Sequence, residues 1–368
     1  MKKISKKAVF AVLKRVVSLA MIVALIVVLQ SVAIKPSDDL SYLYEIFVGK
    51  KSKYQGIIEI WNIDTFEGGT GSKFSFLEAR AKEFEKQNKG LYFLIRNVTE
   101  QECLNMLEAG ESPDLFSCSY GVAPKLEKYV QPFSKQFDIA KNYLEAGKSQ
   151  NSQFALAWCR GAYCLISTKA NLEKAKVDTN TKVDLISNVL NLGYETQGKK
   201  KTYTTYSVSY GTAKYLMPQN ALLSYNVNML ETSNKLAFDK SKDSQTPYSA
   251  YCSFVAGESV MLLGTQRDIA RMENRAVQGK VSDVIYQPLT KYNDLVQFLM
   301  LSKTNNNTKL CYMENFAEFL VSEKSQKQLE KIGMFSVVIS NVLPYRKGVM
   351  FDIASENIES QSVLNLFA

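Results

Sequence analysis

The order of the predicted elements indicates an α/β fold in which a parallel sheet is covered by helices. Residues 57–63 (IIEIWNI), 91–95 (LYFLI) and 115–119 (LFSCS) are short apolar runs typical of buried strands, and segments with helical spacing lie between them. Such alternation favours parallel strands, because each helix provides the crossover to the next strand. The chain has 368 residues, which is enough for two lobes with separate cores.

The first of these strands ends in a turn with three glycines, TFEGGTGS at residues 65–72. The residues that follow, up to 88, carry apolar side chains at i, i+3 and i+7, as expected of a helix with one face in the core. Neither phosphate-binding fingerprint fits, because Ser72 separates the last glycine from Lys73 and the glycines do not match GxGxxG. The free N–H groups at the helix start still favour an acceptor-rich or anionic group.

Further elements follow the same alternation. We expect a helix at residues 99–110 and a long final helix at 313–332, closed by Gly333. The region 183–261 has a helical pattern with tyrosine-rich loops. Additional strands are expected at residues 161–167, 259–264, 283–289 and 295–301.

The N-terminus has the pattern of an export or anchor segment. A basic lead precedes an uninterrupted apolar run of 14 residues at 16–29. A membrane-spanning helix needs about 20 apolar residues, so this run favours a signal peptide at residues 1–33 with cleavage after Ala33. An uncleaved anchor remains the alternative, because Lys14 and Arg15 could snorkel out of a longer segment. In either case the body is exported, and residues 34–53 form a tether.

The net charge of +9 is carried mainly by this N-terminal segment. Residues 1–35 hold seven lysine and arginine side chains and no acid, which leaves 38 basic and 36 acidic side chains in the rest. The body is therefore nearly neutral, and we expect no nucleic-acid partner.

The absence of histidine from the sequence excludes several kinds of site. Ser–His–Asp and Cys–His triads and the HExxH metal site all need an imidazole. The six cysteines lack the spacing of metal ligands, so neither a metal nor a cofactor is expected. Cys159 and Cys164 are the closest pair. On one strand they would point to opposite faces and could not form a disulfide, so we expect buried free thiols, with disulfides as the alternative.

Two carboxylates follow the first strand, at the edge where open α/β sheets bind ligands. Asp64 and Glu67 could form a glycosidase pair. They could equally accept hydrogen bonds from sugar hydroxyls without any reaction.

The tryptophans are the other candidates for ligand contact. Trp61 and Trp158 are the only two in the chain, and each lies near the end of a predicted strand. A flat ring at a cleft can stack on the apolar face of a sugar, although core packing is the alternative for each ring. A tyrosine cluster offers further rings: Tyr203, Tyr206 and Tyr210.

Four stretches, taken in order, carry a resemblance that covers residues 55–340. The first is the strand–glycine turn–helix–strand unit at 57–95, and the second is LEAGESPDLFSCS at 107–119. The third, at 154–177, includes Ser167-Thr168-Lys169, and the fourth, at 313–337, has serine and glutamine at Ser322 and Gln326. Together they resemble the family 1 extracellular solute-binding proteins of ABC importers, the class that contains maltose- and oligosaccharide-binding proteins.

The resemblance implies a periplasmic-binding-protein-like fold of two α/β lobes joined by hinge strands. Lobe I would comprise residues 54–163 and 298–335, and lobe II residues 164–297 and 336–368. The protein would be a monomeric, non-catalytic binding component at the extracellular face of the membrane. It would capture an oligosaccharide-like solute and deliver it to the permease subunits of an ABC importer. The alternatives are a carboxylate-dependent glycoside hydrolase and a membrane-tethered solute sensor.

The resemblance also implies where the ligand binds. Lobe I would contact it through the glycine turn and the turn after the third strand, and the crossover segment would add further side chains. Gln266 and Arg267 stand where the family often has Gly-x-Trp, and Arg267 together with Arg160 could favour an anionic or branched ligand, unless both form salt bridges. The candidate ligand-binding residues are Trp61, Asp64, Phe66, Glu67, Ser119, Tyr120, Trp158, Arg160, Tyr163, Gln266 and Arg267.

Overall fold

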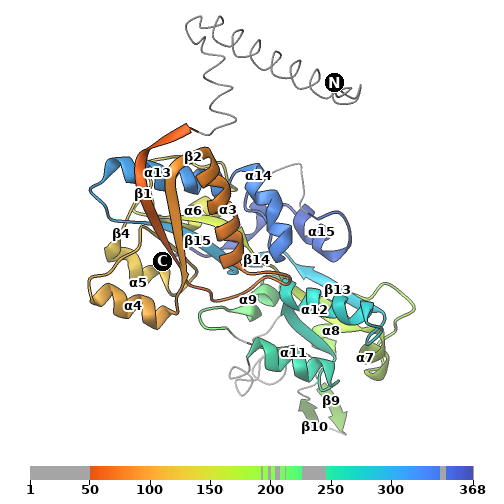
Figure 1. The fold of residues 1–368 in the computed structure, drawn as a ribbon. Coiled ribbons are helices and arrows are strands. Elements are labelled where there is room, and N and C mark those ends of the chain that lie inside the picture. Colours follow the sequence, from red (N-terminus) through yellow and green to blue (C-terminus); the bar gives the residue numbers. More distant parts are fainter. Residues whose placement is uncertain are drawn as a thin grey trace, which may run out of the picture. The chain divides into compact units, whose positions relative to one another are not determined.

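The computed structural model of the protein describes residues 50–191, 194–197, 200–203, 208–211, 213–225, 246–339 and 345–367. The predicted N-terminal segment, most of the tether and the side chains of Tyr203 and Tyr206 lie outside these residues. The chain forms two compact units, residues 1–52 with 86–89 and residues 53–85 with 90–368. The second unit contains the second of the two large sheets and most of the first (Figure 1), together with all residues of the site described below.

The first sheet has six strands in the order β2-β1-β3-β15-β4, with β7 also paired to β15. The strands are β1 (Lys50–Asn62), β2 (Asn88–Asn97), β3 (Leu115–Cys118), β4 (Val130–Gln131), β7 (Ala155–Arg160) and β15 (Val296–Ser302). The predicted parallel arrangement is right for β1 and β3. It is wrong around β15, which runs antiparallel to β3, β4 and β7. The chain reaches β15 from the second sheet rather than through a helical crossover, so nothing imposes a parallel direction.

Helices α3 (Lys73–Gln87), α4 (Glu100–Glu108) and α13 (Asn307–Leu320) supply apolar side chains to the core of this sheet. The predicted bounds of α3 and α4 are confirmed to within two residues. Thr99 and Glu102 form a capping box at the start of α4, which satisfies backbone donors that the helix leaves free. The predicted helix at 313–332 is wrong as a single helix. Ser322 caps a new turn there, and the chain continues as α14 (Glu323–Gln326) and a 3₁₀ segment, η3 (Lys327–Ile332).

The second sheet has the order β11-β12-β8-β13. Its strands are β8 (Tyr163–Thr168), β11 (Val208–Tyr210), β12 (Met261–Thr265) and β13 (Val284–Leu289). Alternate residues of β8 enter two different cores: Tyr163 and Leu165 lie in one, and Cys164 and Ile166 in the other. Both faces of this sheet are therefore covered. β11 is a correction to the purely helical pattern expected at 183–261.

Helices α8 (Leu185–Asn191) and α9 (Pro218–Leu223) contribute to one of these cores, and α11 (Pro247–Val255) and α12 (Gln266–Val277) to the other. The remaining helical elements are α5 (Ala123–Leu126), η1 (Glu127–Tyr129), α6 (Lys141–Ala146), α7 (Lys169–Lys174), α15 (Gly348–Ser355) and η4 (Ile358–Ser360). The remaining strands are β5 (Lys148–Ser149), β6 (Ser152–Gln153), β9 (Tyr194–Gln197), β10 (Lys200–Tyr203), β14 (Tyr292–Asn293) and β16 (Ser362–Val363).

The two sheets carry three cores, which form two sets. The first set is the single core with residues of β1, β3, β7 and β15, and the second set is the pair of cores with residues of β8 and β12. The chain passes between the sheets at residues 161–162 and again at 290–295. The C-terminal tail is shared, because Ile353 lies in a core of the second sheet, whereas Ile358 and Leu366 lie in the core of the first. The predicted lobe bounds remain a prediction.

All six cysteines are free. Cys103, Cys118, Cys159 and Cys164 are buried, and Cys252 and Cys311 are exposed. Cys159 and Cys164 lie on different strands, β7 and β8, rather than on one strand. Within the part of the chain that the structure describes, every helix is too short or too polar to span a bilayer.

Candidate functional site

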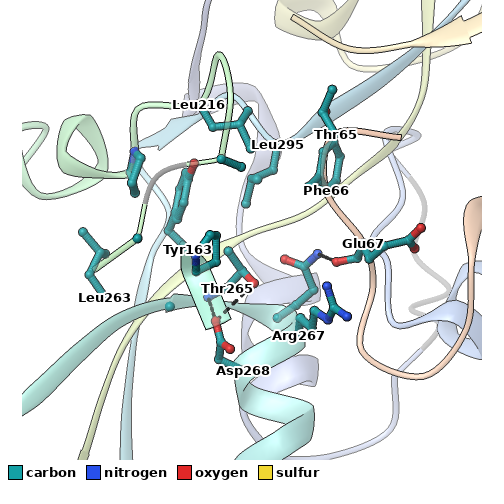
Figure 2. Close-up of a pocket in the computed structure, with 16 residues that line it drawn as sticks. Thr65, Phe66, Glu67, Tyr163, Leu216, Leu263, Thr265, Arg267, Asp268 and Leu295 are labelled. Carbon is teal, nitrogen blue, oxygen red and sulfur yellow. Dashed lines mark hydrogen bonds between the residues drawn. The ribbon is translucent and has the colours of Figure 1, made fainter. Parts of the chain in front are cut away.

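A cavity of about 100 Å³ lies where the glycine turn (residues 65–72) meets the start of α12 and the segment 211–218 (Figure 2). Its walls combine residues packed on the first sheet with residues of the second. The lining residues are Thr65, Phe66, Glu67, Tyr163, Gly211, Ala213, Leu216, Pro218, Pro247, Leu263, Gly264, Thr265, Gln266, Arg267, Asp268 and Leu295.

The three glycines of the turn allow two close backbone approaches. A Cβ on Gly68 would lie 1.6 Å from the carbonyl oxygen of Ile332, and one on Gly69 would lie 2.4 Å from the Cβ of Ala270 in α12. Gly71 also packs against Ile332. These contacts leave no room for side chains, so the glycines are needed to seat the turn between η3 and α12.

Lys73, the first residue of α3, stabilises the glycine turn through its buried ammonium group. Its side chain is fully buried, and its ammonium lies 3.2 Å from Asp64 Oδ1. The same ammonium donates a hydrogen bond to the Phe66 carbonyl and lies 3.8 Å from the centre of the Phe66 ring. A buried ammonium is stable only with such partners, so Lys73 fixes both ends of the Asp64–Phe66 segment.

Glu67 lies next to this ion pair. Burial, then the negative charge of Asp64, raises the pKa of Glu67 to about 7, against the opposing effects of Lys73 and Arg267. Glu67 Oε2 and Asp64 Oδ1 are both buried without a hydrogen bond among the described residues. Protonation of the Glu67 carboxyl, which its raised pKa favours, would give its buried oxygen a hydrogen to donate.

Helix α12 provides the facing wall. Gln266 is fully buried, and its side chain accepts a hydrogen bond from Ala162 N at 2.9 Å and donates one to the Glu67 carbonyl at 3.1 Å. Asp268 completes a capping box with Thr265 at the helix start. Arg267 is exposed at the rim, with its side chain beside Glu67 (Figure 2). Of these three side chains at the helix start, only Arg267 is free to meet a ligand.

The third wall is fixed by a buried carboxylate, Asp294. It accepts hydrogen bonds from Tyr163 OH at 2.6 Å, from Met217 N at 2.7 Å and from Tyr292 OH at 3.1 Å. Burial raises the pKa of Asp294, and the three donors oppose that shift. The network ties the segment before α9 to the strand β8, so the Tyr163 ring has a fixed position in the cavity.

Comparison with known proteins identifies the fold of the chain, but no family is identified from its sequence. No family model and no curated protein sequence matches the chain. The GacH receptor of Streptomyces glaucescens, solved unliganded and in complex with acarbose, aligns with a TM-score of 0.51 at 14% identity over 78% of this chain and 81% of that one. An ABC substrate-binding protein of Listeria monocytogenes in complex with cycloalternan aligns with a TM-score of 0.50 at 13% identity, over 82% of each chain. The maltose-bound MalE3 protein of T. maritima aligns with a TM-score of 0.50 at 13% identity, over 77% and 82%.

The chain has the fold of ABC solute-binding proteins. The predicted fold class is thereby confirmed for the body of the chain. In a solute-binding fold the ligand lies between two lobes that close on it.

The structure brings five of the predicted site residues to this cavity: Phe66, Glu67, Tyr163, Gln266 and Arg267. Two more adjoin it. Asp64 reaches the turn through its ion pair with Lys73, and the hydroxyl of Ser119 is hydrogen-bonded to that of the lining residue Thr65.

The other four predicted residues lie away from the cavity lining, with their side chains buried. Trp158 stacks on the Phe76 ring with centroids 5.5 Å apart, and Trp61 lies edge-on to Phe116. Tyr120 donates a hydrogen bond to the Leu364 carbonyl at 2.8 Å. Arg160 is buried against the Phe335 ring and donates to the Ser336 carbonyl, so its predicted salt bridge does not occur among the described residues. A ligand contact by these four remains a prediction.

Lys73 and Asp294 position the site, and neither was among the predicted residues. Lys73 follows a failed phosphate-binding fingerprint, and that was its only signal in the sequence. Asp294 lies in a short polar turn with no motif. No group of three or more acidic or cysteine side chains that could hold a metal ion occurs among the residues that the structure describes.

Proposed function

We propose that the chain is the solute-binding component of an ABC importer and that it captures an oligosaccharide-like carbohydrate in this cavity. The observation that carries the proposal is that the walls of the cavity come from elements of both large sheets. Phe66 and Glu67 belong to the glycine turn of the first sheet, and Tyr163 and Arg267 belong to elements of the second. A ligand held between them favours the approach of the two parts, and that change of shape can be read by a permease.

The lining suits a sugar in its chemistry. Phe66, Tyr163 and the leucine side chains offer flat and apolar surface for the apolar face of a pyranose ring. Arg267 and Glu67 supply polar groups at the rim. The present volume of about 100 Å³ is small beside the roughly 300–1,000 Å³ typical of ligand pockets, so an oligosaccharide enters only when the walls move apart.

The remaining parts of the proposal concern location and partners. The body is exported and acts at the extracellular face of the membrane. It is either held there by the N-terminal segment or released by cleavage near Ala33. Its partners are the solute and the permease subunits, it acts as a monomer, and it catalyses no reaction.

The glycosidase alternative is disfavoured by the geometry of its two carboxyl groups. Of the two residues, only Glu67 lines the cavity, whereas Asp64 lies outside the lining and is paired with the buried Lys73 ammonium. A glycosidase needs its two carboxyl groups about 5 Å or more apart, on opposite sides of the scissile bond.

Thermal unfolding of the full chain with a panel of ligands tests the proposal. The panel contains neutral oligosaccharides such as maltotriose and mannotriose, uronates, sugar phosphates and peptides. A sugar at 100 times its dissociation constant should stabilise the protein by about 2.7 kcal/mol. Phe66→Ala should abolish this shift, whereas Leu94→Ala, at an exposed position on β2, should leave it unchanged. A panel without any sugar-dependent shift, or a shift with peptides alone, contradicts the proposal.

A further inference from the structure

A second contact joins the two sets of cores, on the other side of the cavity. Tyr215, in the segment between β11 and α9, packs its ring against the core of the first sheet, whereas the next residue, Leu216, lies in a core of the second. Gly121, in the turn after β3, receives that ring. A Cβ on Gly121 would lie 2.0 Å from it, and the glycine has φ +77°, so both space and backbone conformation require glycine there.

A cluster of charges surrounds the Tyr215 hydroxyl. Glu100, the first residue of α4, accepts hydrogen bonds from Lys125 Nζ at 2.5 Å, from Lys214 Nζ at 2.7 Å and from Tyr215 OH at 2.8 Å. Lys125 also donates to the Tyr215 oxygen at 2.9 Å. Glu100 and Lys125 come from helices packed on the first sheet, and Lys214 and Tyr215 from the segment that lines the cavity.

The backbone at Tyr215 indicates that this contact holds the segment in place. Tyr215 has φ 71°, the left-handed region that residues other than glycine rarely adopt. Two residues further on, Met217 N is anchored to Asp294. Strained residues of this kind cluster at ligand clamps and switches, and they persist only where surrounding contacts enforce them.

We propose that Glu100, Lys125, Lys214 and Tyr215 form a latch that stabilises the closed arrangement of the cavity, with or without a ligand. The ligand enters after the latch opens; this last step rests on the proposed function. The segment 213–218 carries the latch and supplies Ala213, Leu216 and Pro218 to the cavity, so its release would widen the cavity directly.

The exposure of the charges makes the latch releasable. The Lys125 and Lys214 side chains are 42% and 68% exposed. Each exposed ion pair of this kind contributes little to stability, and salt weakens it further. Burial raises the pKa of Glu100, but the hydrogen bonds from Lys125, Lys214 and Tyr215 together lower it to about 2. The Glu100 carboxylate therefore stays ionised near neutral pH, and ionic strength rather than pH controls the contact.

A distance measurement between the two sets of cores tests the latch. The two exposed cysteines lie in suitable places, Cys311 on α13 and Cys252 on α11, while the other four are buried. Spin labels on these two residues of the full chain report the separation by pulsed electron resonance, without any ligand. Wild-type protein in low salt should give a mainly closed distribution with a minor open population. Glu100→Gln and Tyr215→Phe should each reduce the ratio of closed to open molecules about threefold.

The matched control is Glu108→Gln, which removes the same charge from an exposed position on the same helix. It should keep the wild-type distribution, and about 1 M NaCl should move the wild type toward the Glu100→Gln distribution. An unchanged distribution in Glu100→Gln overturns the latch. If that variant fails to fold, Lys214→Met removes a latch partner from the exposed side, and a wild-type distribution there overturns it equally.

The same variants distinguish a failure of the latch proposal from a failure of the proposed function. The distance measurement needs no sugar, so its outcome stands even if no sugar binds. If a sugar of the panel does bind, its association rate should rise about threefold in Glu100→Gln, in proportion to the open population. An association rate equal to that of wild type in a variant whose distances have shifted overturns the second half of the inference, that entry requires opening.

Discussion

The two contacts beside the cavity join the same two sets of cores by opposite means. The glycine turn meets α12 through backbone and a small side chain, with one neutral amide, Gln266, between them. The latch joins its partners through exposed charges and one tyrosine. Backbone packing is insensitive to salt and tolerates no added atoms, whereas exposed ion pairs break and re-form readily. The comparison implies that salt weakens the latch and leaves the contact between the glycine turn and α12 unchanged, so opening begins at the latch.

The largest effect on stability is expected for Gly68→Ala in the glycine turn. The added Cβ would lie 1.6 Å from the Ile332 carbonyl oxygen, so the backbone of the turn or of η3 has to shift. We expect the free energy of unfolding in urea to fall by about 3 kcal/mol.

Gly110→Ala is the matched control for this prediction. Gly110 has φ +87° but nothing within 4 Å of an added Cβ, so it isolates the backbone penalty, about 1 kcal/mol. Equal losses in the two variants would show that the glycine turn is not tightly packed.

The next effect concerns the Lys73 ammonium, which contacts the glycine turn. Lys73→Met leaves the Asp64 carboxylate without its partner, and we expect unfolding free energy to fall by about 2 kcal/mol. Adding Asp64→Asn removes the unpaired charge and should restore at least half of the loss. A double variant whose losses simply add would show that the two groups do not interact.

A smaller effect should appear in the pH dependence of stability. Because the pKa of Glu67 is raised from 4.5 to about 7, the folded protein binds this proton more tightly than the unfolded chain, and stability falls as pH rises through that window. Glu67 is only partly buried, so we expect wild type to lose only about 1 kcal/mol relative to Glu67→Gln between pH 5 and pH 8. Glu108→Gln should follow the wild-type curve, and parallel curves for all three proteins would exclude the raised pKa of Glu67.

The smallest effect is expected at the latch. Lys214→Met is the same substitution as Lys73→Met, but its side chain is 68% exposed, so unfolding free energy should change by no more than about 0.5 kcal/mol. Urea unfolding of both variants under one set of conditions makes the comparison direct. A loss at Lys214 as large as that at Lys73 would mean that the latch is a fixed part of the fold.

Local patterns in the sequence were sufficient for the elements that lead to the site. Helix α3 was expected at 72–88 and spans Lys73–Gln87, because its apolar spacing and the glycine at its end are local signals. The break at Ser322 was missed, since Leu329 and Ile332 keep the apolar spacing while the backbone changes to a 3₁₀ segment. The strand β11 was missed because its short, polar sequence is buried only by its neighbours.

The site itself was predictable only in part. Phe66 and Glu67 follow from their position after a strand, which is a topological rule. Trp158 lies near the end of β7, yet Phe76 of α3 covers its ring, and no local pattern says which strand ends are covered. Tyr215 depends on a glycine 94 positions earlier in the sequence, Gly121, and such a pair becomes visible only in three dimensions.

The burial of both tryptophans has a consequence for optical assays. Trp61 and Trp158 lie in the same core, with at most 1% of either side chain exposed, and neither lines the cavity. Their emission should therefore be blue-shifted in the native protein and should move to longer wavelength when the first sheet melts. Because neither indole lines the cavity, a silent fluorescence titration would not argue against sugar binding, which the thermal unfolding assay detects by a different signal.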